Sequence, residues 1–293
     1  MKTHSLQTLD KREFDLFREF IYKECGISLA ETKVALLSNR LRKRIKVLNL
    51  ETFEDYYNVL TGGGSAADEE MGHFLSAVTT NETYFFRNDG LWEFVSGELI
   101  QYLEEKFPSR SGPAWNFWSA ASSSGEEAYT LAIVLREALP GYDPKKLKIV
   151  GTDISRRVLE KAKNAVYDDY SVQKTSPEIR SKYFDQDSES GLWKVKPLIR
   201  NAVEFRFHNL RDRFMGAKFH VVFLRNVMMY FDLEMKLRVL ERIKEVMHPG
   251  GVLIMGDVDP MRQGGDLKER IALDYWKPTI YRVPVSNSSQ GSS

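Results

Sequence analysis

Residues 116–139 read NFWSAASSSGEEAYTLAIVLREAL and place an apolar run, a loop of small residues and an apolar helix in direct succession. Within this stretch, 116–121 predicts a buried strand and 126–139 predicts a helix. A second unit follows, in which LKIVGT at 147–152 predicts a strand and 155–165 predicts a helix. Strands that alternate with helices of this length predict a doubly wound α/β domain with a largely parallel sheet.

The same alternation continues downstream. Further elements are expected as strands at 203–207, 220–224 and 252–255 and a helix at 233–247. Residues 168–202 fit neither period, and their turn at Ser188–Gly191 lies between aromatic-containing runs. This pattern predicts an inserted antiparallel β-hairpin around 183–197.

Residues 8–80 predict helices only. Phe14, Phe17 and Ile21 recur at helical spacing before Gly26, which is expected to end the first helix. Three more helices are expected, at 32–48, from Thr52 to the glycines at 62–64, and through Phe74 to Val78. The expected organisation is a small all-α domain at 1–80, a linker and interdomain segment at 81–113, the α/β domain at 114–285 and a disordered tail at 286–293.

Composition excludes several classes of protein. The 293 residues hold 42 Lys and Arg against 41 Asp and Glu, so a net charge of +1 argues against a globally basic nucleic-acid-binding protein. The single cysteine, Cys25, excludes an internal disulfide and a thiolate metal site. No apolar run reaches the roughly 18 residues of a membrane span, and no signal-peptide core follows Met1. We therefore expect a soluble, cytoplasmic protein without membrane insertion.

The ends of the first two predicted strands indicate a nucleoside-type cofactor. Ligands of open α/β sheets bind beyond the carboxyl ends of the strands. The loop AASSSGEE at 120–127 lets a ligand approach the backbone but is not a dinucleotide fingerprint. Asp153 ends the second strand, where a carboxylate can accept hydrogen bonds from ribose hydroxyls. S-adenosylmethionine fits this pattern better than NAD or ATP, although Asp153 could instead cap the helix that starts near Ser155.

Two further polar segments are candidates for the site. Arg225 and Asn226 directly follow an apolar strand and are expected to face the ligand crevice. Tyr230 follows them and could equally be a packed aromatic residue. The segment TTNETYFFR at 79–87 lies at the domain junction, and its plain interpretation is a capped helix start with aromatic residues in the interdomain core.

Three segments together resemble the signature blocks of chemotaxis receptor methyltransferases, the CheR family. These segments are TTNETYFFR at 79–87, WSAASSSGEE at 118–127 and RNVMMYF at 225–231. The resemblance covers roughly residues 8–285. It implies a Rossmann-like S-adenosylmethionine-dependent methyltransferase domain with an inserted antiparallel β-subdomain, preceded by a small all-α domain.

The resemblance also implies an activity and a set of site residues. The activity is methyl transfer from S-adenosylmethionine to glutamates in the cytoplasmic domain of chemoreceptors, with S-adenosylhomocysteine as product and no metal. Arg87 and Tyr230 are implied to lie beside the transferred methyl group. The implied cofactor contacts are Asn81, Thr83, Arg87, Glu127, Asp153, Asn209, Leu210, Arg225 and Asn226. Because a glutamate with a pKa of about 4.3 is already ionised at neutral pH, the reaction needs positioning and no general base.

The second helix carries a run of basic residues. Six basic residues and no acid occur between Lys33 and Lys46. Such a run is usually a solvated face, and nucleic acid could use it as well. In the context of the family it is a candidate dock for an acidic receptor helix, through Arg40, Arg42, Lys43, Arg44 and Lys46. In some family members the β-subdomain captures a C-terminal receptor peptide as an added strand, which is a second candidate contact.

Two other functions stay open at this point. An RNA methyltransferase could use the same α/β domain and grip phosphates with the basic helix. A non-catalytic module could bind S-adenosylmethionine or S-adenosylhomocysteine and regulate a partner. The chain also departs from the family pattern at Asn88, at Ala128 and at GDVD in 256–259. None of these departures removes a proposed cofactor contact.

Overall fold

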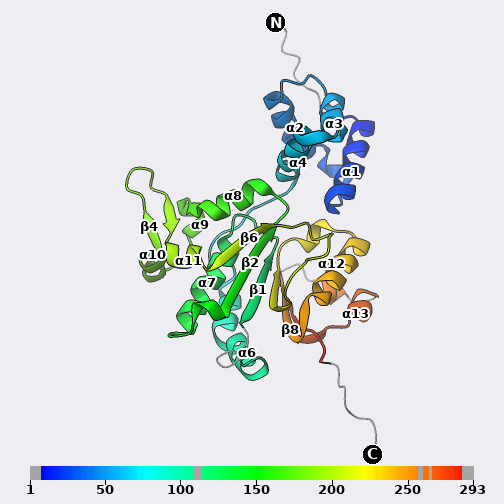
Figure 1. Cartoon of the computed structure of the whole chain (residues 1–293). Coiled ribbons are helices and arrows are strands. Elements are labelled where there is room, and N and C mark those ends of the chain that lie inside the picture. The colour runs from blue at the N-terminus through cyan, green and yellow to red at the C-terminus, as the bar shows by residue number, and fades with distance from the viewer. Residues whose placement is uncertain (1–7, 109–113, 257–259, 264–265, 286–293) are drawn as a thin grey trace, which may run out of the picture.

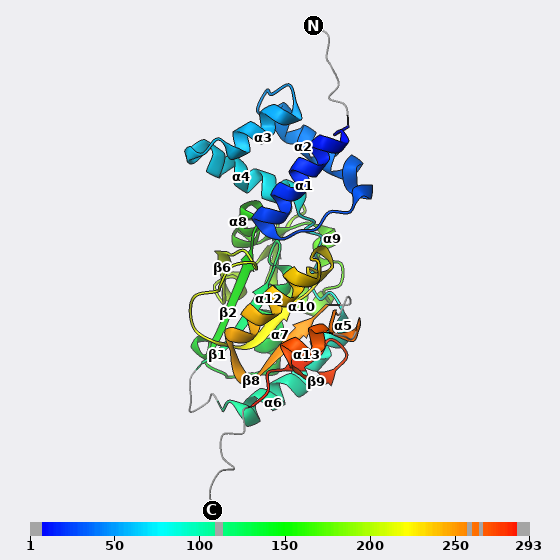
Figure 2. The ribbon, with the colours of Figure 1, turned by 90° about the vertical axis from the view of Figure 1, so that its right-hand side faces the viewer.

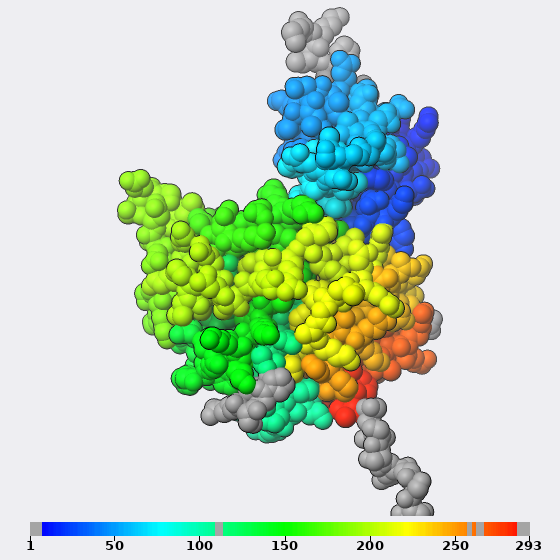
Figure 3. Space-filling model, in the orientation of Figure 1, coloured from blue at the N-terminus to red at the C-terminus, as the bar shows by residue number. Residues whose placement is uncertain are grey.

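The structure is a computed structural model that describes residues 8–108, 114–256, 260–263 and 266–285. Figure 1 shows a lobe of helices from the N-terminal part of the chain standing on a larger α/β body. A small second sheet projects from the side of that body. Figure 2 shows the same arrangement after a quarter turn, and in Figure 3 the helical lobe protrudes from one end of the body.

Four helices form the N-terminal lobe, as the sequence predicts. Their bounds are α1 Lys11–Cys25, α2 Val34–Val47, α3 Phe53–Thr61 and α4 Gly64–Val78, with the short 3-10 helix η1 Glu31–Lys33 before α2. Asp10 begins α1 through a reciprocal capping box with Glu13, and Thr52 begins α3 in the same way with Asp55. Gly26 ends α1 in the left-handed conformation with φ 74°, as predicted from its position.

A buried ion pair holds α2 against α4. Arg44 donates from two guanidinium nitrogens to the carboxylate of Glu70, at 2.9 and 2.6 Å. The Tyr56 hydroxyl donates to the same carboxylate at 2.7 Å. Glu70 is only 4% exposed, so these two partners stabilise its negative charge in place of water.

In the part of the chain that the structure describes, seven strands form the main sheet in the order β6-β2-β1-β7-β8-β10-β9. Their bounds are β1 Trp115–Ala120, β2 Leu147–Asp153, β6 Val203–Phe207, β7 Phe219–Leu224, β8 Met247–Met255, β9 Asp274–Lys277 and β10 Ile280–Arg282. The strands β6, β2, β1, β7 and β8 pair parallel with one another, as predicted, whereas β10 pairs antiparallel with β8 and β9. The chain moves from β1 out to β6 and returns on the other side of β1 with β7. The switch point of strand order therefore lies between β1 and β7, where such sheets bind ligands.

Helices cover both faces of this sheet. The helical elements of the body are α5 Asp89–Phe94, the π-helix η2 Val95–Leu99, α6 Ile100–Lys106, α7 Glu126–Ala138, η3 Pro144–Lys146, α8 Arg156–Asn164, η4 Met228–Tyr230, α12 Leu233–Glu245, η5 Pro260–Gln263 and α13 Asp266–Ile271. Along β7, Val221 and Phe223 belong to the core under α5, α6 and α7. Val222 and Leu224 belong to the core that includes α12 and continues into the helical lobe. Burial on both faces explains why these strands are continuous apolar runs.

The insert is a small antiparallel sheet, as predicted. It has the order β3-β5-β4, with β3 Val166–Tyr167, β4 Phe184–Gln186 and β5 Trp193–Val195. Three short helices accompany it, namely α9 Asp169–Val172, α10 Pro177–Tyr183 and α11 Pro197–Arg200. The predicted hairpin corresponds to β4 and β5, which pair from Phe184 with Val195 to Gln186 with Trp193.

The structure adds helices to the segment expected to link the domains, and two other expectations concern residues that it does not describe. The segment 81–113, expected to link the domains, contains the helical run from α5 to α6, and Trp92 of this run stacks on Phe223 of β7 with ring centres 5.9 Å apart. The predicted disordered tail at 286–293 and most of the family departure at 256–259 lie outside the described residues. Within the described part of the chain, no helix is both long enough and apolar enough to cross a membrane.

Arg44→Ala should destabilise the protein on the order of 3 kcal/mol, because it leaves the Glu70 carboxylate buried without its cation. Urea unfolding measures this cost. Lys43→Ala is the matched control, since Lys43 is exposed on the same helix and its loss should change stability by about 0.5 kcal/mol or less. Equal effects of the two substitutions would contradict a structural role for Arg44.

Candidate active site

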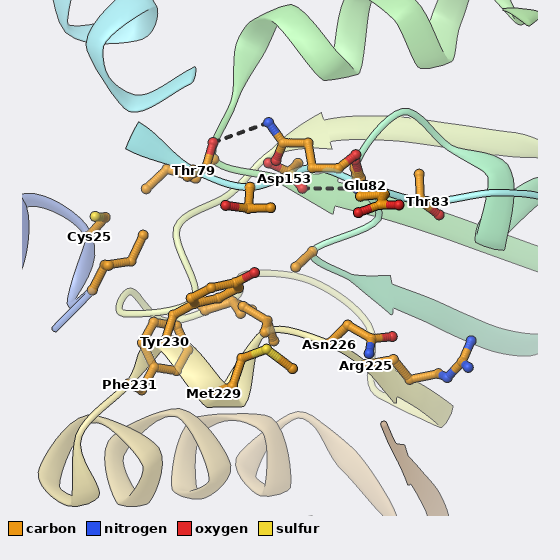
Figure 4. Close-up of a pocket in the computed structure, with 18 of the residues that line it drawn as sticks. Cys25, Thr79, Glu82, Thr83, Asp153, Arg225, Asn226, Met229, Tyr230 and Phe231 are labelled. Carbon is orange, nitrogen blue, oxygen red and sulfur yellow. Dashed lines mark hydrogen bonds between the residues drawn. The ribbon is translucent and has the colours of Figure 1, made fainter. Parts of the chain in front are cut away.

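A cavity of about 540 Å³ lies between the helical lobe and the carboxyl ends of β1, β2, β6 and β7. Its wall comes from the end of α1 and the segment after it, from the junction 78–87, and from the loops that follow these four strands. Figure 4 shows side chains from these separate segments converging on one space. The cavity has a volume typical of small-molecule sites.

The structure brings every predicted cofactor and transfer-site residue to this cavity. The residues that line it include Asn81, Thr83, Arg87, Glu127, Asp153, Asn209, Leu210, Arg225, Asn226 and Tyr230. They come from segments up to about 150 residues apart in the sequence, and the strand order of the sheet together with the junction segment brings them together. Their individual roles stay predictions.

The loop after β1 is a tight turn of small residues. Ala121, Ser123 and Gly125 have positive φ angles of 62°, 51° and 94°. A Cβ atom on Gly125 would lie 2.8 Å from the Phe205 ring and 2.9 Å from the Ala162 side chain. Glycine is therefore required at 125 for both conformation and close packing. The turn presents backbone rather than bulky side chains to the cavity.

Asp153 organises the same loop. Its two carboxylate oxygens accept the backbone N–H groups of Ser123 and Ser155, each at 2.9 Å. The N-cap of α8 is Ser155, whose hydroxyl accepts the N–H of Val158. The alternative that Asp153 itself caps α8 is therefore wrong. Burial raises the pKa of Asp153, and its carboxylate still lines the cavity.

Glu127 and Arg225 form an ion pair in the cavity wall. Arg225 donates from a terminal nitrogen to Glu127 at 2.9 Å, and its side chain is 4% exposed. Ser119 of β1 donates its hydroxyl to the other carboxylate oxygen at 2.7 Å. The second terminal nitrogen of Arg225 reaches the backbone carbonyl of Arg87 at 3.4 Å. One pair of charges thus connects β1, α7, β7 and the junction segment.

The junction segment is irregular rather than helical. α4 ends at Val78 and α5 begins at Asp89, so the interpretation of 79–87 as a helix start is wrong. The Asn81 carbonyl accepts the Ser123 hydroxyl at 3.0 Å, which ties the segment to the loop after β1. Phe85 is fully buried between Tyr167 and Phe184, with ring centres 4.9 and 5.0 Å away. The segment is thereby anchored to the inserted sheet as well.

Asn209 and Tyr230 lie on the side of the cavity that meets α1. The Asn209 side chain donates to the Glu24 carbonyl at 2.8 Å and accepts the N–H of Arg211 at 3.1 Å. Its amide is thus engaged within the protein. Figure 4 shows the Tyr230 hydroxyl directed into the cavity, which favours the site over simple packing for this residue.

Comparison with known proteins assigns these segments to one family. The model of the CheR methyltransferase SAM-binding domain matches residues 81–275, and that of the CheR methyltransferase all-alpha domain matches residues 12–79. The chain belongs to the CheR methyltransferase family. It is therefore an S-adenosylmethionine-dependent methyltransferase, and the family associates this activity with chemotaxis.

Curated relatives agree with this assignment. Chemotaxis protein methyltransferase 1 of Pseudomonas aeruginosa is 36% identical over 83% of this chain and 88% of its own length. Chemotaxis protein methyltransferase 2 of the same organism is 33% identical over 92% of this chain and 93% of its own length. The chemotaxis protein methyltransferase of Salmonella typhimurium is 34% identical over 85% of this chain and 83% of its own length.

The cavity of this CheR-family chain fits S-adenosylmethionine in its polar groups. The Glu127–Arg225 pair offers both signs of charge, which suits an amino-acid moiety. The Asp153 carboxylate retains acceptor capacity for ribose hydroxyls, since each oxygen receives one N–H group. The apolar side chains of Ile154 and Leu210 also line the cavity and suit an adenine ring.

Several lining residues could not be found from sequence patterns. Cys25, Ile27 and Leu29 belong to the end of α1 and the turn after it, and Lys33 and Leu36 follow them along the chain. No motif marks them, because only the packing of the lobe on the body places them at the cavity.

The basic residues of α2 do not all lie free for docking, contrary to the expectation from the sequence. Arg40 donates to the Val78 carbonyl at 2.6 Å, and Arg44 binds Glu70.

Glu126 is another residue that no sequence pattern marked. It precedes Glu127 in α7 but points into the interior, where it is 1% exposed. Consecutive helical residues differ by about 100° in direction, so neighbouring glutamates can have opposite environments. The Ser124 hydroxyl donates to the Glu126 carboxylate, and Lys161 lies 4.0 Å away. Burial raises the pKa of Glu126 from 4.5 to about 7.

Glu126→Gln should raise the melting temperature at pH 8 and change it less at pH 5. The folded state raises the pKa of Glu126, so the stability that this group contributes is present at pH 5 and is lost as the pH rises through about 7. Glutamine keeps the acceptor for Ser124 without ionising. We expect a gain of about 2–4 °C at pH 8, measured by thermal unfolding.

The exposed Glu160→Gln is the control for that experiment. Glu160 lies on α8 and pairs with Lys163 at the surface, so its substitution should have the same small effect at both pH values. A pH-independent effect of Glu126→Gln would show that the carboxyl group ionises normally in the folded state.

Proposed function

We propose that this methyltransferase transfers the methyl group of S-adenosylmethionine to glutamate side chains of chemoreceptors and forms glutamyl methyl esters. Family membership and the names of the curated relatives support the chemotactic setting. The chemistry of the cavity wall supports a carboxylate acceptor, and this observation carries the proposal.

Four titratable groups of the cavity wall, Cys25, His208, Glu127 and Glu82, are poorly suited to deprotonate an acceptor. Burial raises the pKa of the Cys25 thiol to about 12 and lowers the pKa of His208, which makes it a weaker base. Glu127 is paired with Arg225, and Glu82 accepts the Tyr170 hydroxyl at 2.8 Å. An amine or alcohol acceptor needs a base, whereas a glutamate is already ionised at neutral pH.

The work of the protein in this reaction is positioning. When bound, S-adenosylmethionine supplies an electrophilic methyl group. An oxygen–methyl bond forms as the methyl–sulfur bond breaks, and no proton moves. We assign the ribose to Asp153, the methionine end to Glu127 and Arg225, and the adenine edge to Asn209 and Leu210. The remaining proposed contacts are Asn81, Thr83, Arg87 and Asn226.

Arg87 and Tyr230 are proposed to orient the reacting groups rather than to transfer protons. Opposite charges of carboxylate and sulfonium neutralise in the transition state, so tight pairing of the acceptor carboxylate would favour the ground state. Arg87 is only partly buried, and it donates to the Glu82 carbonyl at 3.3 Å while lying over the Tyr84 ring. A guanidinium held in this way can orient an anion without a fixed ion pair.

The acceptor is proposed to approach along α2. Lys33 and Leu36 of this region line the cavity, and Lys43 and Lys46 are exposed farther along the helix. Because Arg40, Arg42 and Arg44 all make contacts within the protein, the docking charge falls mainly on these lysines. Binding of an acidic receptor helix would then weaken with salt. A receptor peptide added to the small inserted sheet stays a separate prediction.

A direct test is to incubate the protein with methyl-labelled S-adenosylmethionine and membranes that contain chemoreceptors. The expected result is protein-bound label that mild base releases as methanol, the behaviour of a glutamyl methyl ester. Label that is stable to base would exclude the ester. Label on added RNA would favour an RNA methyltransferase, and cofactor binding without any labelled acceptor would favour a non-catalytic module.

Asp153→Asn should weaken binding of S-adenosylhomocysteine at least about tenfold through loss of the ribose contacts. Because Asp153 also holds the loop at Ser123, calorimetry should compare this ligand with its 2′-deoxy analogue. The substitution should cost much less affinity for the analogue, which lacks one of the hydroxyls. Equal losses for both ligands would assign the effect to the loop and remove Asp153 from the ribose site.

A further inference from the structure

The segment Gly26–Leu29, here called the strap, leaves α1 and crosses from the helical lobe onto the α/β body. Ile27 forms an isolated antiparallel bridge with Phe231. The N–H of Ser28 donates to the backbone carbonyl of Tyr230 at 2.8 Å. The strap therefore pairs with the chain at the residue whose hydroxyl points into the cavity.

The end of α1 makes further contacts on either side of this pairing. The Tyr22 side chain hydrogen-bonds Asp232, and this bond raises the pKa of the Tyr22 hydroxyl. Asp232 in turn caps α12 by accepting the N–H of Met235 at 2.9 Å. A Cβ atom on Gly26 would lie 2.7 Å from the end of the Met235 side chain, so the strap packs directly on α12.

Within its own segment, the backbone of Tyr230 is held by one short helical turn, and its side chain packs against the core shared by the lobe and the body. Its N–H donates to the Val227 carbonyl at 3.1 Å in the short helix η4, which spans three residues. Met229 beside it is 43% exposed. Short 3-10 helices have poorer hydrogen-bond geometry than α-helices. The strap thus supplies a backbone partner to the Tyr230 carbonyl, between Met228 and Phe231, which are buried in the core.

We propose that the strap positions Tyr230 for methyl transfer, with the Ser28 N–H as the positioning group, so that the helical lobe is part of the catalytic machinery. This inference rests on the proposed role of Tyr230 in methyl transfer to glutamate. Displacement of a reacting or orienting group by about 1 Å can cost on the order of a hundredfold in rate. A lobe that served only to dock the acceptor would affect acceptor binding instead.

Ser28→Pro tests this role because proline lacks the N–H that binds the Tyr230 carbonyl. Glu31→Pro is the matched control in the same connection. Position 31 begins η1, and the preceding Ala30 already has φ −69° and ψ 150°, the extended conformation that precedes proline. Tyr22→Phe is a milder second variant, with Tyr57→Phe as its control within the lobe.

For Ser28→Pro we expect turnover with receptor membranes at saturating cofactor to fall at least about tenfold. The dissociation constant for S-adenosylhomocysteine should change less than about threefold, and the KM for receptor should stay near that of the unchanged protein. Tyr22→Phe should also lower turnover with little change in the dissociation constant or KM, but by a smaller factor. Both proline and phenylalanine controls should behave like the unchanged protein.

Amide hydrogen exchange tests the positioning without any acceptor. Exchange in peptides covering 226–232 should accelerate in Ser28→Pro and Tyr22→Phe, whereas exchange in β8 should not change. Unchanged exchange at 226–232, or unchanged turnover in both variants, would overturn the inference. Absence of base-labile label with the unchanged protein would instead contradict the proposed function, and the exchange result would still decide whether the strap holds Tyr230.

Discussion

The ion pair between Glu127 and Arg225 is the contact on which the geometry of the site most depends. A largely buried charge pair needs further hydrogen bonds, and here the Ser119 hydroxyl and the Arg87 carbonyl supply them. The pair fixes the start of α7 against the end of β7 and reaches the junction between the lobe and the body. Loss of either charge would therefore disturb the loop after β1, the junction and the end of β7 together.

The helical lobe has two structural roles that meet at the cavity. Its second helix presents lysines toward the solvent beside the cavity, and the end of α1 contacts the body at Asn209, Tyr230 and Asp232. The body holds the groups expected to bind the cofactor. The cavity exists only because the lobe rests on those strand ends, so cofactor binding and acceptor approach share one interdomain surface.

Much of this arrangement could be predicted from the sequence because it follows from local patterns. Apolar runs that alternate with helices predict the parallel sheet, and the carboxyl ends of its strands predict that Asp153, Glu127 and Arg225 converge. The antiparallel pair β9 and β10 was not predicted, since these strands are short and carry no distinct pattern. The burial of charged side chains could not be predicted either, because no sequence pattern distinguishes the buried Glu126 from its neighbour Glu127, or Arg44 from its neighbour Lys43. The strap pairs with Tyr230 through backbone atoms, and a pattern of side chains in the sequence cannot predict such a contact.

The most direct measurement is a crystal structure of the protein with S-adenosylhomocysteine bound. We expect density in the interdomain cavity, with the ribose hydroxyls on Asp153, the amino-acid end at Glu127 and Arg225, and the sulfur facing Tyr230. Density at another site, or a ligand whose ribose lies away from Asp153 in this cavity, would contradict this assignment.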